Sequence, residues 1–189
     1  MVSQEKLYTS ADLWELSHLP ENDGKRLLLL EGELYEMTPT GWKHGDVASE
    51  LDVAIGSYVK AHKLGRVTAA ETGYDLAPGT TLAPDVGFVA AVRVPDPLPI
   101  GYVPFAPDLA VEVVSPGNSS TELNTKIKKY MKHGTRLLWI VYPEKQTVAV
   151  YRPIATGQEA HVEFLDLDGF LDGADVLPGF KLALREIFK

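Results

Sequence analysis

Two acidic residues lie within short apolar runs of this sequence, and a lysine follows them in a segment with helical spacing. Asp85 stands in the run PDVGFV, and Glu112 stands in the run LAVEVVSP. Lys126 belongs to the next segment, SSTELNTKIKKYMKHG. A carboxylate inside a buried strand costs free energy unless it is paired or holds a metal ion. Two such carboxylates and one inward lysine can form a site that cuts phosphodiester bonds.

Glu112 is the only charged residue within 109–114 of its predicted strand. Side chains alternate between the two faces of a strand, and both faces here are apolar apart from Glu112. This pattern favours a central strand that is covered on both sides. The alternative for Glu112 is a structural ion pair or a place near solvent at the strand end. The alternative for Asp85 is turn chemistry, because Pro-Asp pairs are common in loops.

Lys126 is the lysine of its predicted helix that can best reach the sheet. The apolar stripe of this helix consists of Leu123, Ile127, Tyr130 and Met131. Lys126 lies roughly 80° from the centre of the stripe, whereas the other lysines of the helix, at 128, 129 and 132, lie roughly 120° or more away. Alternatively, Lys126 extends along the side of the helix and places its ammonium group in solvent.

His44 shares a helical stripe with apolar residues of the longest predicted helix, which covers 44–63. Its side chain is therefore expected to face inward. A lone inward histidine is more often a hydrogen-bonded structural residue than a ligand or a base.

Hydrophobic periodicity predicts the elements that position these residues. In chain order it predicts a short capped helix after Thr9, a hairpin of 27–30 and 33–37, a helix over 44–63, a strand over 66–76, strands at PDVGFV and DLAVEVV, a helix from a Ser119–Glu122 capping box to Gly134, and strands at RLLWIVYP and TVAVYRP. This order predicts an α/β or α+β fold with a mixed central sheet flanked by helices. The length predicts one domain over 1–189.

Composition restricts the chemistry further. The sequence contains no cysteine, which excludes disulfides, zinc-thiolate sites and thiol nucleophiles. A bound metal would take oxygen or imidazole ligands, which favours Mg²⁺ or Mn²⁺ over zinc. The net charge of −8 argues against a general nucleic-acid coat, but not against a nuclease with a local basic strip. Without a signal peptide or a membrane span, we expect a cytoplasmic protein and no membrane partner.

Several short motifs, in this order, resemble a known family: LEGELYEMTP, then His44, APDVGFV, LAVEVVSP, ELNTKIKKYMKHG, LLWIVYP and LPGFKLAL. They run from about Arg26 to Phe188. The pattern resembles the PD-(D/E)XK restriction-endonuclease-like superfamily and, more narrowly, is similar to the bacterial Uma2 family of endonucleases. Each motif is short, and it is their order and spacing together that carry the resemblance.

The resemblance implies a metal-dependent endonuclease acting on DNA. Asp85 and Glu112, with the backbone carbonyl of Val113, would hold Mg²⁺ or Mn²⁺. The superfamily's usual lysine position holds Val114 here, and Lys126 from the next helix matches the lysine of the family. His44 would contact a phosphate or a metal-bound water. Cutting both strands of a duplex would suit a two-fold dimer.

The sequence also departs from the family pattern. Leu28 stands where a glutamate is usual, Leu137-Leu138 where Glu-Tyr is usual, and Tyr142 where an aspartate is usual. These departures keep two alternatives open. One is a nuclease-fold module that binds nucleic acid or protein with little or no turnover. The other is a structural or protein-interaction domain in which Glu112 and Lys126 form a buried ion pair.

Overall fold

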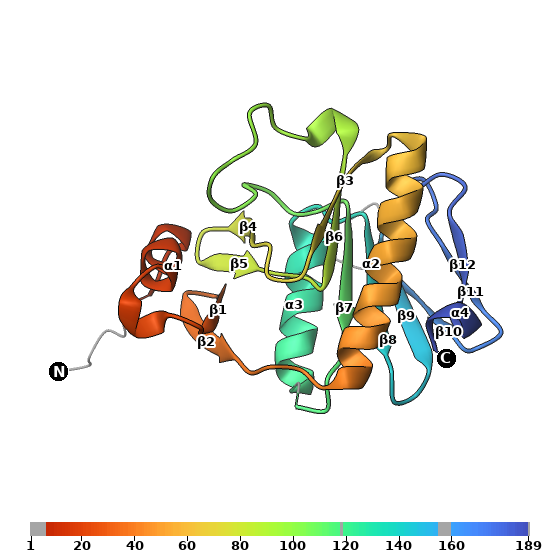
Figure 1. The fold of residues 1–189 in the computed structure, drawn as a ribbon, viewed down its shortest axis with the longest axis horizontal. Helices are drawn as coiled ribbons and strands as arrows, with labels where there is room; N and C mark the ends of the chain where they lie inside the picture. Colours follow the sequence, from red (N-terminus) through yellow and green to blue (C-terminus); the bar gives the residue numbers. More distant parts are fainter. Residues whose placement is uncertain (1–6, 118, 155–159, 189) are drawn as a thin grey trace.

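The chain folds into both helices and strands in the computed structural model, which describes residues 7–117, 119–154 and 160–188 (Figure 1). The α-helices are α1 (Ser10–Ser17), α2 (Trp42–His62), α3 (Ser120–Lys132) and α4 (Leu184–Ile187). The first strands are β1 (Arg26–Leu30), β2 (Glu33–Met37), β3 (Gly65–Ala69), β4 (Tyr74–Ala77), β5 (Thr80–Leu82) and β6 (Val86–Ala90). The later strands are β7 (Leu109–Val113), β8 (Leu137–Tyr142), β9 (Thr147–Pro153), β10 (Ala160–Leu165), β11 (Phe170–Asp172) and β12 (Lys181–Ala183).

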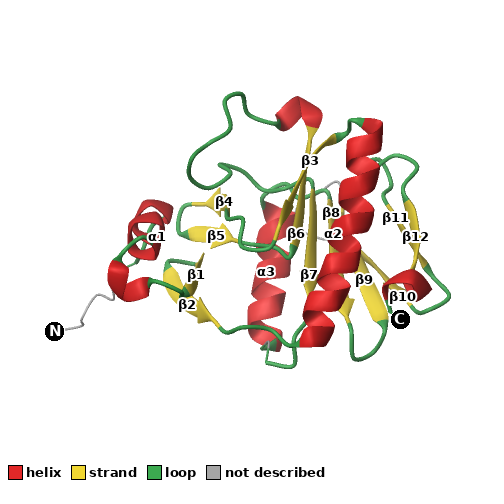
Figure 2. Cartoon of the chain, in the orientation of Figure 1, coloured by secondary structure: helices red, strands yellow, loops and turns green. Residues whose placement is uncertain are grey.

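A six-stranded mixed sheet forms the centre of the fold, in the order β10-β9-β8-β7-β6-β3. β7 and β8 are parallel, and α3 lies between them in the sequence. The other neighbouring strands of this sheet are antiparallel. A second sheet has the order β2-β1-β5-β4, and β11 pairs with β12. The predicted mixed central sheet flanked by helices is confirmed (Figure 2).

α2 covers one face of the central sheet (Figure 1). Its buried residues, Val47, Leu51, Ile55 and Val59, recur at the spacing of one helical face. They pack in one cluster with the odd-numbered residues of β7. The predicted helix over 44–63 is confirmed with shifted ends, since α2 begins at Trp42 and ends at His62. Lys63 caps it in a left-handed conformation with φ of 55°. None of the helices in the described residues is long and apolar enough to cross a membrane.

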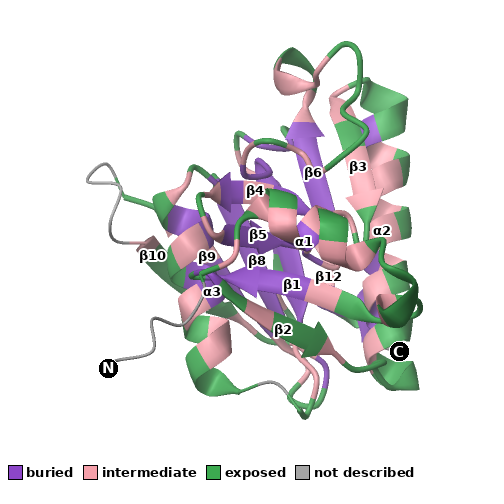
Figure 3. Ribbon diagram, turned by 90° about the vertical axis from the view of Figure 1, so that its left-hand side faces the viewer, coloured by how far each residue is buried: buried purple, intermediate pink, exposed green. Residues whose placement is uncertain are grey.

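α3 covers the opposite face, where it packs against the even-numbered residues of β7 and β8 and against the second sheet. The predicted stripe is confirmed, because Ile127, Tyr130 and Met131 are buried and Leu123 packs against the same cluster. All five residues of β7 are buried, as expected for a central strand. The concentration of buried residues in the central strands is visible in Figure 3. Side-chain alternation along β7 directs Glu112 toward α3.

The strand predicted over 66–76 is wrong as a single element. The chain turns after Ala69, where Glu71 has a positive φ of 74°, and continues as β4 in the other sheet. Gly73 lies in this turn, and a Cβ there would lie 2.3 Å from the ring of Tyr102. The turn therefore depends on a close contact with a distant loop, which local periodicity does not report.

Candidate functional site

The candidate site lies at the carboxyl end of β7, beside the residue that precedes β6. β6 runs antiparallel to β7, so the start of β6 lies next to the end of β7. Asp85 occupies this position. Its backbone N–H donates to the carbonyl of Val111 (2.9 Å), and its Oδ2 accepts from the N–H of Val113 (2.7 Å). Asp85 is therefore hydrogen-bonded to both residues that flank Glu112 in β7.

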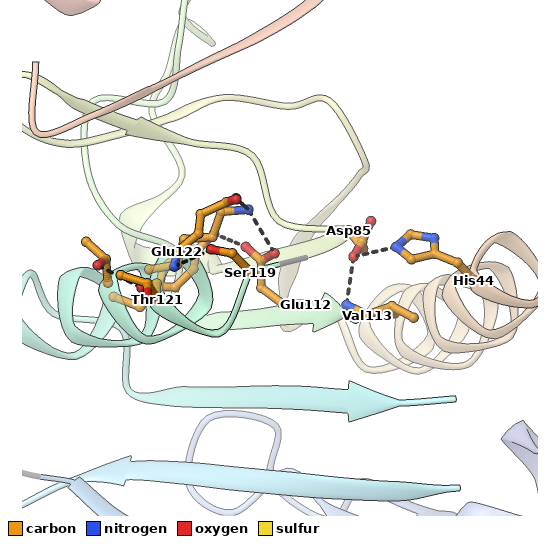
Figure 4. A network of polar contacts seen from close by, with 10 residues as sticks. His44, Asp85, Glu112, Val113, Ser119, Thr121 and Glu122 are labelled. Atoms are coloured by element: carbon orange, nitrogen blue, oxygen red, sulfur yellow. Dashed lines mark hydrogen bonds and ion pairs between the residues drawn. The ribbon is translucent and has the colours of Figure 1, made fainter. Parts of the chain in front are cut away.

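Glu112 lies on the same side of β7 as Asp85 (Figure 4). Its side chain is 10% exposed. Its Oε1 accepts a hydrogen bond from the hydroxyl of Tyr130 (2.7 Å), and its Oε2 lies 3.6 Å from Nζ of Lys126. The structure thus brings together the two acids and the lysine that the sequence singled out.

Lys126 is buried on α3, with a side chain that is 8% exposed. Its Nζ lies between two carboxylates, 3.6 Å from Glu112 and 3.3 Å from Oε1 of Glu122, one helical turn earlier. The inward direction predicted from the helical wheel is confirmed. The predicted cap of α3 is confirmed in part. Ser119 Oγ accepts from the N–H of Glu122 (3.0 Å), but the carboxylate of Glu122 turns to Lys126.

His44 reaches the site from the first turn of α2 (Figure 4). Its Nε2 lies 3.4 Å from Oδ2 of Asp85, and its side chain is 11% exposed. Its Nδ1 is buried and has no hydrogen-bond partner among the described residues. The expected inward histidine therefore contacts one of the two acids directly.

Burial and neighbouring charges act together on the titratable groups of the site. Burial raises the pKa of Glu112, and the charge of Asp85 adds to this effect, whereas Lys126 and Tyr130 oppose it. The carboxylate of Glu112 raises the pKa of Lys126 by more than burial lowers it. The hydrogen bond to Asp85 raises the pKa of His44. Each cationic group is thus stabilised by the acid beside it.

Asp85 and Glu112 are the acids of the site that could serve as ligands of a hard, hydrated divalent cation. No group of three His, Cys, Asp or Glu side chains that could hold a metal is found in the part of the chain that the structure describes. Mg²⁺, however, keeps several waters and often takes only one or two protein carboxylates. Asp85 and Glu112 supply these from one side of β7, with the carbonyl of Val113 next in the chain. The three carboxylates of Asp85, Glu112 and Glu122 outnumber the positive groups of the site, which are Lys126 and, when protonated, His44. The site therefore keeps a net negative charge for such an ion to balance.

A small pocket opens between the end of β7 and the start of α3. Its lining consists of Glu112, Val113, Val114, Glu122, Leu123 and Lys126. Its volume of about 10 Å³ approaches the smallest space that holds one water molecule. The pocket can therefore admit a water beside the glutamates and the lysine, but not a nucleotide.

Tyr130 and Glu122 are contacts of the site that the sequence reasoning missed. The sequence assigned Tyr130 only to the apolar stripe and Glu122 only to the helix cap. Both lie four residues from Lys126, on the same helical face, and this spacing was the available signal. Lys129 also differs from expectation, because it is mostly buried and pairs with Glu31 in the β1–β2 turn (2.8 Å).

The positions that depart from the family pattern are packed with apolar groups. Leu28 and Leu138 are buried in the cluster on the α3 side, at 3% and 0% exposure, and Leu137 is buried in the cluster on the α2 side. Tyr142 packs against the α3-side cluster and is half-buried. These positions therefore hold packed side chains in place of the acids that the resemblance led us to expect.

Comparison with known proteins agrees with this arrangement. The family model Uma2, described as "Putative restriction endonuclease", matches residues 13–185. The chain belongs to the Uma2 family. A similar solved structure is described as a "putative nuclease belonging to DUF820" from Anabaena variabilis ATCC 29413. It aligns with a TM-score of 0.81 at 25% identity, over 96% of this chain and 97% of the other. No curated protein matches the chain.

Proposed function

We propose that this Uma2 protein is a metal-dependent endonuclease that hydrolyses DNA phosphodiester bonds. The observation that carries the proposal is that Asp85, just before β6, Glu112 of β7 and Lys126 of α3 lie together at the carboxyl end of β7. The descriptions of the family and of the similar solved structure as nucleases support the same reaction class. A phosphodiester is a fitting substrate because its hydrolysis needs charge stabilisation and an activated water, which this set of side chains can supply.

Asp85, Glu112 and the carbonyl of Val113 would hold Mg²⁺ or Mn²⁺. A divalent ion bound there would lower the pKa of a bound water and offset the negative charge of the transition state. The protein's contribution is to hold the two carboxylates in place before the ion arrives. The two backbone hydrogen bonds of Asp85 and the hydroxyl of Tyr130 on Glu112 do this.

Lys126 would orient the attacking water or donate to a phosphate oxygen. Its raised pKa keeps the ammonium group charged, which suits stabilisation of negative charge rather than proton abstraction. The contact with Glu112 holds the ammonium group of Lys126 inside the fold. Glu122 is more exposed, at 27% of its side chain, and can move aside when a phosphate approaches.

His44 would hold Asp85 in its orientation and reach a phosphate of the substrate. The contact of Nε2 with Asp85 supports the first role. Because Nδ1 is buried, the second role would require the His44 ring to turn when the substrate binds.

A second candidate is a nuclease-fold module that binds nucleic acid or protein without turnover. The burial of Leu28, in place of the family's glutamate, favours it, because this hairpin then supplies no acid at that position. Cleavage distinguishes the two candidates.

The test is a cleavage assay with Mg²⁺, with Mn²⁺ and with a chelator, on linear duplex, supercoiled and single-stranded DNA. Glu112→Gln and Glu122→Gln form a matched pair, since both glutamates contact Lys126. We expect cleavage by the wild type with either metal, a loss of at least 100-fold in Glu112→Gln, and cleavage retained in Glu122→Gln. Equal losses in both variants would refute the assigned roles, and absence of cleavage by the wild type on every substrate would favour the binding module.

A further inference from the structure

Within the described residues, no strand pairs with the outer edge of β10 in the central sheet. β10 is the last strand of the six-stranded order, and β9 is its neighbour (Figure 3). The two strands pair over six consecutive residues without a shift in register, from Ala160 opposite Pro153 to Leu165 opposite Val148. The outer backbone groups of β10 therefore form a regular row that can accept another strand.

β10 lacks the devices that usually prevent edge-to-edge pairing. Its sequence, AHVEFL, contains no proline and no lysine, and its register contains no bulge. Its one carboxylate, Glu163, is paired with Arg152 of β9 (3.0 Å). The opposite edge of the sheet, β3, differs because it carries the exposed Arg66 and begins at Gly65, which has a φ of 156°.

One face of β10 is apolar and exposed. Ala160, Val162 and Phe164 alternate on this face, and Val162 and Phe164 are 36% and 73% exposed. They stand opposite Pro153, Tyr151 and Ala149 of β9. The other face carries His161 and Glu163. An open strand edge with two exposed apolar side chains fits a partner strand of matching pattern.

We propose that β10 pairs with β10 of a second copy of this chain, antiparallel and centred on Val162. In this register Val162 faces the partner's Val162, and Phe164 faces the partner's Ala160. His161 faces the partner's Glu163, so a histidine meets a carboxylate on the other face. A centre at Glu163 would instead place two carboxylates opposite each other, which is unfavourable. In this register the sequence AHVEFL is complementary to itself. The partner strand that fits the edge of β10 is therefore β10 of a second copy of the chain.

The pairing produces a two-fold dimer with a continuous sheet through both protomers. The β7 strands of the two protomers are then seven strand positions apart, or about 34 Å at the usual spacing between strands. Each candidate site is complete within one protomer. The dimer therefore does not depend on the proposed nuclease activity and can be tested without it.

Single-cysteine variants test the register directly, because the chain contains no cysteine. Opposite residues in antiparallel strands have Cα atoms about 4.5–5.5 Å apart, within the range of a disulfide. Val162→Cys should therefore form a covalent dimer under mild oxidation at low protein concentration. Phe164→Cys is the matched control, since its two copies would lie about 14 Å apart. A mixture of Ala160→Cys and Phe164→Cys should cross-link.

Light scattering after gel filtration tests the dimer itself. We expect twice the protomer mass of 20.7 kDa for the wild type. Val162→Lys should give the mass of one protomer, because it places two lysines opposite each other. Val92→Lys, at an exposed valine outside β10, should remain dimeric. A monomeric wild type, a dimeric Val162→Lys, or cross-linking of Phe164→Cys as efficient as that of Val162→Cys would overturn the proposal.

Discussion

Lys126→Met removes one charge of a buried pair and leaves the other in place. Methionine retains most of the apolar stem of lysine, so the packing of α3 changes little. Glu112 then keeps the hydrogen bond from Tyr130 but loses its nearest positive charge, and Asp85 continues to repel it. A buried carboxylate without a cation is strongly destabilising unless it takes up a proton.

Proton uptake sets an upper limit on this loss of stability. Protonating a carboxyl group whose unperturbed pKa is about 4.3 costs about 4.4 kcal/mol at pH 7.5 and about 2.3 kcal/mol at pH 6.0. We therefore expect Lys126→Met to lower the free energy of unfolding by about 3–4 kcal/mol at pH 7.5 and by about 2 kcal/mol at pH 6.0. In the variant, the raised pKa of Glu112 makes the folded state bind a proton that the unfolded chain has released. Stability relative to wild type is therefore lost as pH rises above the unfolded pKa and through the folded one.

The assay is urea unfolding of wild type and variant at both pH values, with a chelator present to remove metal ions. Comparing the two proteins at each pH cancels the titration of groups that they share. Lys128→Met is the control, because Lys128 is exposed on the same helix and its loss should change stability by no more than about 0.5 kcal/mol. A difference between wild type and Lys126→Met that stays constant, or grows toward pH 6.0, would refute this account of the pair.

Two further predictions concern the acids of the central sheet. Millimolar Mn²⁺ should stabilise the wild type, by about 2.7 kcal/mol at an Mn²⁺ concentration of 100 times Kd, and should therefore raise its unfolding temperature in calorimetry. Asp85→Asn should abolish this rise. An equal rise in the variant would mean that Mn²⁺ binds nonspecifically. Asp108 is 1% exposed, contacts Arg93 (2.8 Å) and accepts from the N–H of Ala90 (2.8 Å) at the far end of β7. Asp108→Asn should lower stability by about 1.5–3 kcal/mol without affecting metal binding, and no change in urea unfolding would contradict the importance of this charged hydrogen bond.

The main elements and the direction of Lys126 could be predicted because local patterns determine them. The two-residue alternation around Glu112 placed it in a covered strand, and β7 is buried along its whole length. The 3.6-residue spacing on α3 separated Lys126 from its neighbours in angle, and the packing of α3 follows that stripe. Both inferences need only the period of the element and the position of its apolar face.

The contacts of the site could not be predicted in the same way, because they depend on which elements meet. Tyr130 has an apolar ring and a hydroxyl, and its place in a hydrophobic stripe concealed the hydrogen bond to Glu112. The helical wheel places Lys129 away from the apolar stripe, but the β1–β2 hairpin lies close enough for Glu31 to pair with it. The division of 66–76 between two sheets likewise depends on Tyr102, about thirty residues further along the chain.

Buried polar groups can stabilise the fold or serve catalysis, and replacing all of them together distinguishes the two cases. Buried ion pairs are often no more stabilising than apolar side chains of similar volume, whereas the loss of one partner is costly. Glu112, Lys126 and Tyr130 form such a set, because each contacts at least one of the others and all are buried. The combined variant Glu112→Leu, Lys126→Met, Tyr130→Phe leaves none of these polar groups unpaired.

We therefore expect the combined variant to be more stable at pH 7.5 than Lys126→Met alone, and within about 1–2 kcal/mol of the wild type. It should show no metal-dependent cleavage and no shift in unfolding temperature with Mn²⁺, because one of the two proposed carboxylate ligands is gone. Urea unfolding and calorimetry on the three proteins decide the matter. If the combined variant is less stable than Lys126→Met, the polar set supports the fold, and the structural ion pair becomes the better explanation of Glu112 and Lys126. If it is stable and inactive while the wild type cleaves DNA, the buried charges are retained for chemistry, because the fold does not need them.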